Sequence, residues 1–331
     1  MNDELFRTKV AIPKSKFEFG YKHKAVMMGS CFVENIGAKL KSFKYRADVN
    51  PFGVIYNPVS VCSSLRLLME GREFVEDDLN FHNNLWFSFY HHSKFSNTDL
   101  STCISDINIE IQKSSKELKE ADFLFVTFGT AWVYELISSG KIVSNCHKLP
   151  AKDFNRYRLN VDEVVSIYKD LLVELFVFNP KVKVVFTVSP IRHWKDGANG
   201  NQLSKATLLL AVEQLTELFE QVSYFPSYEI VMDELRDYRF YTEDMQHIGD
   251  AAVKYIWQRF SDTFLNDDSK QIQKKVEKFV LAANHRPFNS NSESHQAFLR
   301  SSLVKIREFV EANPSVNMDM EIESLKKNLL E

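Results

Sequence analysis

Apolar runs and helical periods alternate along the first 260 residues of the chain. Continuous apolar runs cover residues 24–28, 122–130 and 182–190, and each of them ends in small or polar residues. Runs of this kind are typical of strands that are buried on both faces of a sheet. A shorter apolar run at residues 228–232 predicts a fourth strand.

Between these runs, apolar positions recur at the spacing of an amphipathic helix. The predicted helices span residues 33–40, 58–69, 104–118, 161–177, 203–219 and 250–260. Strands that are separated by helices of this length form parallel β-α-β units with right-handed crossovers. We therefore predict an α/β fold, a doubly wound three-layer sandwich with a mostly parallel sheet in the flavodoxin-like order.

The last part of the chain has a different pattern. No strand is predicted after residue 267, and residues 269–282, 292–312 and 319–330 are helical by period and by charge pairing. Pro287 interrupts this region. The sequence thus predicts an α/β domain over residues 1–265 and a C-terminal helical extension over residues 266–331 that packs on it.

Composition narrows the class of protein. The 331 residues are 44% hydrophobic and 13% aromatic, which is ample for a buried core. With 41 basic and 44 acidic residues the net charge is −3, so neither nucleic acid nor an anionic membrane is expected as a partner. The four cysteines form no Cys-x-x-Cys pair, which argues against a zinc knuckle or a disulfide framework and suits a reducing compartment.

Targeting and cofactor signals are also missing from the sequence. The first residues lack the pattern of an export signal, and no apolar run approaches about 18 residues. We therefore expect a cytoplasmic protein. Glycine-rich phosphate-binding motifs and metal-ligand spacings do not occur, so no cofactor and no metal are expected.

Ser30 is the first residue that suggests chemistry. It follows Gly29 at the end of the first predicted strand and precedes a predicted helix. In open α/β sheets ligands bind beyond the carboxyl ends of the strands, and a helix N-terminus there favours negative charge. Ser30 is therefore placed where a nucleophile would be useful. The alternative is that its hydroxyl only caps the helix.

Asp244 and His247 form the second candidate element. They follow the fourth predicted strand in the order Asp-x-x-His, a spacing that lets the carboxylate hold one nitrogen of the imidazole. The other nitrogen would then accept a proton from Ser30, which is the logic of nucleophile, base and orienting group. Taken alone the motif is weak, because many exposed pairs at this spacing are only surface hydrogen bonds.

These elements together resemble a known family. Gly29-Ser30-Cys31-Phe32-Val33 is similar to the Gly-Ser-Cys-Phe-Ala signature of the GSCFA-domain family, within the SGNH/GDSL hydrolase superfamily. Further similar blocks agree in order over residues 20–260: residues 50–58, 127–132, 145–148 and 188–193, followed by the Asp-x-x-His pair.

The resemblance implies roles for several residues. Ser30 would be the nucleophile, His247 the base and Asp244 the group that orients it, while the amides of Ser30 and Gly53 would form an oxyanion hole. The third donor of the superfamily, an Asn in a Gly-x-Asn segment, has no counterpart in Gly129-Thr130-Ala131. Loss of one such donor costs about 100- to 1,000-fold in rate.

The remaining candidates have two interpretations each. Thr130, Asn145 and His147 are candidates to replace the missing Asn, and Asn145 and His147 otherwise belong to a polar loop. Arg192 and His193 follow the third strand and would face substrate or solvent. Cys31 would be either an activated thiol at a helix N-terminus or a small packing residue. The aromatic residues Trp132, Trp194 and Tyr90 would form either a sugar-stacking surface or part of the core.

The sequence predicts a serine esterase or acyl-ester hydrolase that acts through an acyl-serine intermediate on a small-molecule or carbohydrate ester. An acyltransferase would differ only in the second acceptor. The missing Asn keeps a third hypothesis open, a ligand-binding module without turnover. The oligomeric state stays undetermined.

Overall fold

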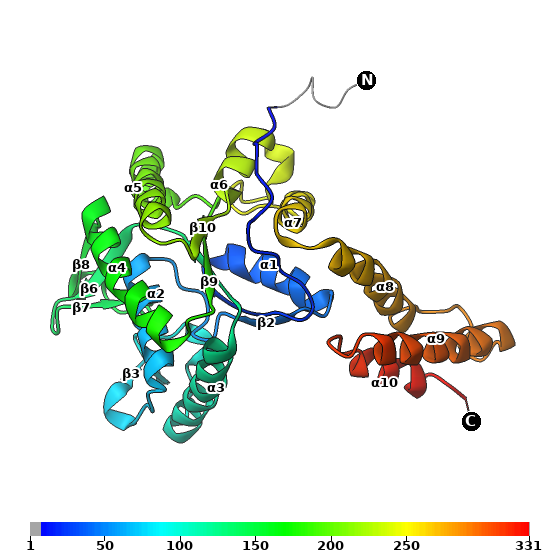
Figure 1. The fold of residues 1–331 in the computed structure, drawn as a ribbon. Helices are drawn as coiled ribbons and strands as arrows, with labels where there is room; N and C mark the ends of the chain where they lie inside the picture. Colours follow the sequence, from blue (N-terminus) through cyan, green and yellow to red (C-terminus); the bar gives the residue numbers. More distant parts are fainter. Residues whose placement is uncertain (1–7, 331) are drawn as a thin grey trace.

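A five-stranded parallel sheet forms the centre of the protein in a computed structural model that describes residues 8–330 (Figure 1). Its order is β10-β9-β5-β1-β2. The strands are β1 (Lys24–Gly29), β2 (Arg46–Val49), β5 (Phe123–Phe128), β9 (Lys183–Val188) and β10 (Val222–Tyr224). Numbered among themselves along the chain, these strands have the order 2-1-3-4-5. This is the flavodoxin-like order, so the predicted fold is confirmed.

The three central strands end side by side. Gly29 of β1 pairs with Thr127 of β5, and Thr127 pairs with Thr187 of β9. The carboxyl ends of these three strands therefore meet at one edge of the sheet.

Helices cover both faces of the sheet, which makes the three layers. One face carries α2 (Pro58–Glu70), α3 (Leu100–Glu120), α4 (Val161–Phe178) and α5 (Gly197–Leu218). The other carries α1 (Cys31–Ser42) and α7 (Asp250–Phe264). Alternate residues of β1 serve the two cores: Val26 packs in the first and Met27 in the second.

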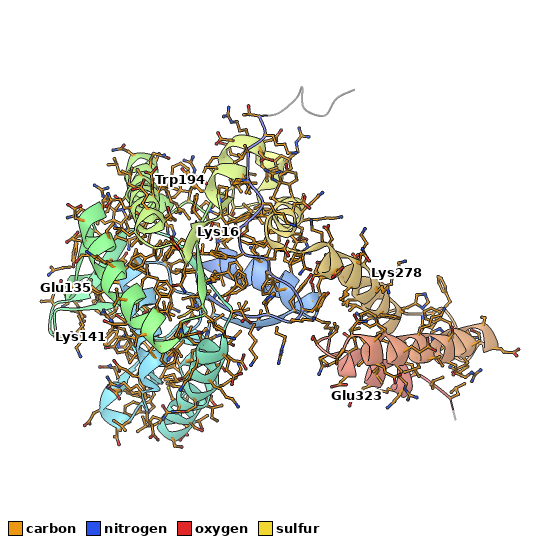
Figure 2. The ribbon with its side chains drawn as sticks, viewed as in Figure 1. Lys16, Glu135, Lys141, Trp194, Lys278 and Glu323 are labelled. Atoms are coloured by element: carbon orange, nitrogen blue, oxygen red, sulfur yellow. The ribbon has the colours of Figure 1, made fainter. Side chains whose placement is uncertain are left out.

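Local signals explain where the helices begin. Pro58 occupies the first turn of α2 and the Asn57 side chain caps it, while Asn160 and Glu163 form a capping box at α4. Side chains fill the layers, and charged residues such as Lys141 and Lys278 lie at the periphery (Figure 2).

The predicted fourth strand at residues 228–232 is wrong. These residues belong to α6 (Ser227–Glu229) and the π-helical turn Ile230–Glu234, and the last strand is the short β10 just before them. Ile230 and Val231 are fully buried in the core on the α1 side. A short apolar run has the same appearance in a buried helix as in a buried strand, which is why the pattern misled.

Other elements were not predicted. The edge strand β2 contains Arg46 and Asp48 and lacks an apolar run. An antiparallel sheet of β6 (Trp132–Leu136), β7 (Lys141–Val143) and β8 (Phe154–Arg158) lies between β5 and α4 in the chain. A small hairpin consists of β3 (Asn80–His82) and β4 (Leu85–Phe87).

The C-terminal region contains α8 (Asp267–Ala283), α9 (Glu293–Ala312) and α10 (Asp319–Lys327), in agreement with the predicted helices. They extend away from the sheet beyond α7 (Figure 1). The Tyr45 hydroxyl donates to Gln273 at 3.2 Å, and Lys44 pairs with Glu321 at 2.6 Å, which ties this region to the α1–β2 side of the core. Among residues 8–330 no helix has the length and apolar character needed to cross a bilayer.

Candidate active site

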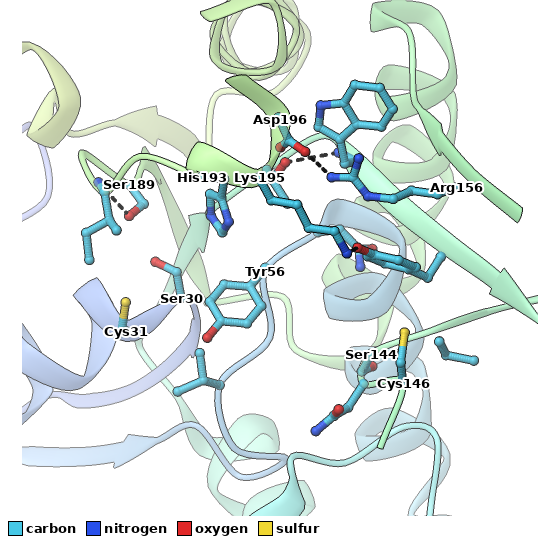
Figure 3. Close-up of a pocket in the computed structure, with 18 of the residues that line it drawn as sticks. Ser30, Cys31, Tyr56, Ser144, Cys146, Arg156, Ser189, His193, Lys195 and Asp196 are labelled. Carbon is cyan, nitrogen blue, oxygen red and sulfur yellow. Dashed lines mark hydrogen bonds and ion pairs between the residues drawn. The ribbon is translucent and has the colours of Figure 1, made fainter. Parts of the chain in front are cut away.

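A cavity of about 680 Å³ opens at the edge where β1, β5 and β9 end. Residues that follow these three strands line it: Ser30 and Cys31 after β1, Thr130 after β5, and Ser189 with residues 191–196 after β9. Figure 3 shows Ser30, Cys31, Ser189 and His193 around this cavity. The volume lies within the range of small-molecule sites in proteins. Gln246 and His247 line the same cavity. Ser30 and His247, which are far apart in the sequence, therefore meet there.

Ser30 sits at a tight junction between β1 and α1. Gly29 has φ of +140°, and a Cβ atom at this position would lie 2.1 Å from the Thr127 carbonyl oxygen, so only glycine fits. Ser30 is the N-cap residue of α1, yet its side chain makes no capping hydrogen bond. Its buried Oγ has no hydrogen-bond partner among residues 8–330. The capping interpretation therefore fails, and the hydroxyl is free.

Asp244 and His247 form a pair in the loop before α7, as their spacing predicted. Asp244 Oδ2 lies 2.5 Å from His247 Nδ1. The other carboxylate oxygen accepts hydrogen bonds from the amides of Gln246 and His247 and from the Thr242 hydroxyl. Together these donors, the His247 side chain first, hold the pKa of Asp244 well below its usual range. Nδ1 is thus engaged, which leaves Nε2 of His247 as the nitrogen available to the cavity.

Ser30 and His247 line one cavity without being hydrogen-bonded to each other. The His247 side chain is 54% exposed, whereas Ser30 is 1% exposed. Hydrogen bonds between nucleophile and base are commonly long in proteins without substrate and tighten in the complex.

The amides expected to form the oxyanion hole have other acceptors. The Ser30 amide donates to the Thr127 carbonyl at 3.2 Å, and the Gly53 amide donates to the Asn50 carbonyl at 2.7 Å. Gly53 does not line the cavity, because the tight turn at Asn50 directs it toward His92. The expected contribution of Gly53 is therefore not supported by this geometry.

Four of the five predicted substrate-binding residues line the cavity: Thr130, Asn145, Arg192 and His193. His147 does not. Its Nε2 lies 3.0 Å from the Ser88 carbonyl oxygen and 3.1 Å from that of His91, and its ring stacks on Phe87. The structure therefore places the His147 imidazole outside this cavity, where it holds the loop of Ser88 and His91.

Cys31 lines the cavity beside Ser30, so it is not purely a core residue. Burial raises the pKa of its thiol, although nearby backbone amides and Lys205 act in the opposite direction. The thiol is therefore less ionised than an ordinary cysteine, which disfavours it as the nucleophile.

The outer wall of the cavity comes from the unpredicted sheet β7-β6-β8. The Arg156 guanidinium lies 4.4 Å from the Trp132 ring centre, and it forms an ion pair with the buried Asp196 carboxylate. The Lys195 Nζ donates to the Tyr134 hydroxyl at 2.6 Å. Trp132 and Trp194 line this cavity as the stacking hypothesis expected, whereas Tyr90 does not.

Lys205 of α5 is a further residue that the sequence did not single out. Its side chain is fully buried, and Nζ donates to the carbonyls of Gly129 at 2.5 Å and Ser189 at 2.7 Å. Burial lowers its pKa to about 7. It thus joins the ends of β5 and β9 directly behind the cavity. Within residues 8–330, His, Cys, Asp and Glu form no group of three that could hold a metal ion.

Comparison with known proteins identifies two family models in the chain. The GSCFA family model matches residues 24–260, and the model of the GSCFA domain protein C-terminal domain matches residues 276–331. No curated protein matches the sequence.

Two solved structures are similar to this chain at low identity. A Clostridium thermocellum family 3 carbohydrate esterase has 10% identity and a TM-score of 0.36, covering 77% of this chain and 98% of its own. An acetyl xylan esterase, Est2A, from the rumen bacterium Butyrivibrio proteoclasticus has 11% identity and a TM-score of 0.33, covering 77% of this chain and 64% of its own.

Proposed function

The chain belongs to the GSCFA family, and from this premise we propose that it is a serine esterase in which Ser30 is the nucleophile, His247 the base and Asp244 the orienting group. One observation carries the proposal. A buried serine hydroxyl without a partner faces a cavity that is also lined by a histidine whose Nδ1 is held by a carboxylate.

The reaction follows from these positions. Ser30 Oγ attacks the ester carbonyl while its proton passes to His247 Nε2, and the carbonyl π electrons move to the oxygen. When the tetrahedral intermediate collapses, the alcohol leaves with that proton and the acyl group stays on Ser30. Water then releases the acid by the same steps in reverse. If a second alcohol replaces water, the same site transfers the acyl group.

For the substrate we propose an acylated carbohydrate. The lining of the cavity includes the aromatic side chains of Trp132, Tyr134 and Trp194, which suit the apolar face of a sugar ring. Arg156 and Lys195 add hydrogen-bond donors to the same lining. A cavity of about 680 Å³ has room for an acyl group and at least one sugar unit.

A second function is favoured by the oxyanion geometry. The amides of Ser30 and Gly53 donate to protein carbonyls, and the chain has Ala131 where the superfamily has the Asn donor. A ligand-binding module without turnover would have these features as well.

The decisive experiment compares esterase activity and labelling among matched variants. The wild type is treated with p-nitrophenyl acetate and with a fluorophosphonate probe, alongside Ser30→Ala, Cys31→Ala and Ser144→Ala, the last removing another hydroxyl of the same cavity. We expect turnover and labelling to disappear only in Ser30→Ala. Labelling that survives Ser30→Ala and is lost in Cys31→Ala would transfer the role to the thiol. A wild type that neither turns over nor labels supports the binding module.

A further inference from the structure

The proposed reaction leaves the developing oxyanion without a side-chain donor, and most candidates beside Ser30 are already engaged. The Thr130 hydroxyl lies 3.1 Å from Ser204 Oγ and accepts a hydrogen bond from the Trp132 amide. Asn145 Oδ1 accepts a hydrogen bond from the His147 amide at 2.9 Å. Its chain neighbours Ser144 and Cys146 lie on the far side of Tyr56 from Ser30 in Figure 3. These contacts disfavour Thr130 and Asn145 as replacements for the missing Asn.

His193 is the imidazole that lies next to Ser30 in Figure 3. Its Nε2 is 3.4 Å from the place that a Cβ atom on Gly129 would occupy. Gly129 begins the Gly129-Thr130-Ala131 segment, and the absence of a side chain there leaves room for the His193 ring. The His193 imidazole therefore lies beside Gly129-Thr130-Ala131, the segment in which this chain lacks the Asn donor.

One contact fixes the ring of His193 and another fixes its backbone. The Tyr56 ring packs edge-on against it with centres 5.5 Å apart, and the His193 backbone amide donates to Asn201 at 3.0 Å. The ring nitrogens of His193 form no hydrogen bond with any of residues 8–330. Charge stabilisation requires a preorganised donor beside the nucleophile, and the His193 ring lies next to Ser30 with its nitrogens unused.

We propose that His193 replaces the missing Asn and donates a hydrogen bond from its imidazole to the oxyanion that forms when Ser30 attacks the ester. This inference rests on the proposed esterase function. As the carbonyl π electrons become a lone pair on oxygen, the His193 N–H group binds that oxygen and keeps its proton. The Ser30 proton goes to His247, and collapse of the intermediate restores the carbonyl.

The surroundings keep His193 uncharged at neutral pH. Burial is the main cause that lowers its pKa to about 4, and the charge of Lys205 on α5 adds to it. Arg156 on β8 and His247 act in the same direction, while Asp196 opposes them. A neutral imidazole carries one N–H group and donates it without becoming a competing acid. The two histidines therefore have separate tasks, with His247 as base and His193 as donor.

The test measures kcat, KM and the pH profile on p-nitrophenyl acetate. His193→Phe keeps a ring against Tyr56 but removes the N–H group, His193→Gln restores an amide N–H, and His82→Ala on the distant hairpin is the control for loss of a histidine. We expect His193→Phe to lower kcat about 100- to 1,000-fold with little change in KM, as for other oxyanion donors. His193→Gln should recover part of this loss, and the acidic limb of kcat/KM should not move.

The outcomes separate this inference from the proposed function. If Ser30-dependent turnover exists but His193→Phe stays within about threefold of the wild type, His193 is not the donor and the esterase function stands. A shifted or lost acidic limb in His193→Gln would make His193 the base and also overturn the inference. Without any Ser30-dependent turnover, both proposals fall. If His193→Phe does not fold, His193→Ala takes its place with the same expected loss.

Discussion

Replacing Lys205 by Met should change how the stability of the protein depends on pH. Lys205 is fully buried, and its pKa is lowered from 10.5 to about 7 by burial. Between these pH values the unfolded chain holds a proton on this lysine that the folded protein lacks. Because stability rises with pH wherever the unfolded state binds more protons, the wild type gains stability across this interval.

The magnitude follows from the width of the interval. One proton changes the free energy of unfolding by about 1.4 kcal/mol per pH unit, so the interval is worth about 5 kcal/mol in total. This cost of burying the charge is fully present below pH 7 and disappears as the pH approaches 10.5. Lys205→Met removes it but leaves the carbonyls of Gly129 and Ser189 without their donor, at about 1–3 kcal/mol each. The two effects nearly cancel at pH 7, so the free energies of unfolding of the two proteins are similar there. Their dependence on pH still differs, because only the wild type has the titrating lysine.

Urea unfolding between pH 7 and 9.5 measures this slope. The free energy of unfolding of the wild type, relative to Lys205→Met, should increase by about 1 kcal/mol or more per pH unit, because other titrating groups contribute equally to both proteins. Lys169→Met, at an exposed position of α4, is the matched control and should keep the slope of the wild type. Parallel curves for the wild type and Lys205→Met would refute the reasoning, since Lys205 would then stay protonated in the folded protein.

Two further predictions concern the junction at Ser30 and the loop at His247. Gly29→Ala should lower the free energy of unfolding by about 3 kcal/mol or more, because its Cβ would meet the Thr127 carbonyl. Gly140→Ala is the control, since Gly140 also has a positive φ but has open space around it, and it should cost only about 1 kcal/mol. Equal losses in thermal unfolding would contradict this. Asp244→Asn should reduce Ser30-dependent kcat about 10²- to 10⁴-fold by disturbing the tautomer of His247, with an unchanged melting temperature because the pair is exposed. The similarly exposed Asp237→Asn should retain activity, and an active Asp244→Asn would remove Asp244 from the mechanism.

The sheet and the position of Ser30 could be predicted because they depend on local patterns. A strand covered on both faces must be apolar along its whole length, so the runs at 122–130 and 182–190 identify β5 and β9 directly. Parallel pairing then requires their carboxyl ends to share an edge with that of β1. The spacing of Asp244 and His247 predicted their pairing for the same local reason.

Contacts between distant residues could not be predicted in this way. Arg156 and Asp196 are separated by 40 residues, and Lys205 lies 76 residues from Gly129. Such pairs leave no periodic signal, so Lys205 has the same appearance in the sequence as any helical lysine. The sheet β7-β6-β8 could not be predicted because its strands are short and half exposed. The engagement of the Gly53 amide depends on a tight turn that the residue types do not specify uniquely.

The beginning of α5 and the loop before it connect the two sides of the cavity. Ser204 Oγ accepts from the Ala131 amide at 2.7 Å, which fixes the start of β6, and Asp196 pairs with Arg156 of β8. His193 and Lys205 come from this same stretch of chain. A change in the outer wall therefore shifts the groups beside Ser30 as well. Arg156 of the outer wall is held by Asp196, which lies in the same segment as His193, the proposed oxyanion donor. We therefore expect substitutions at Arg156 to alter kcat together with KM, instead of KM alone.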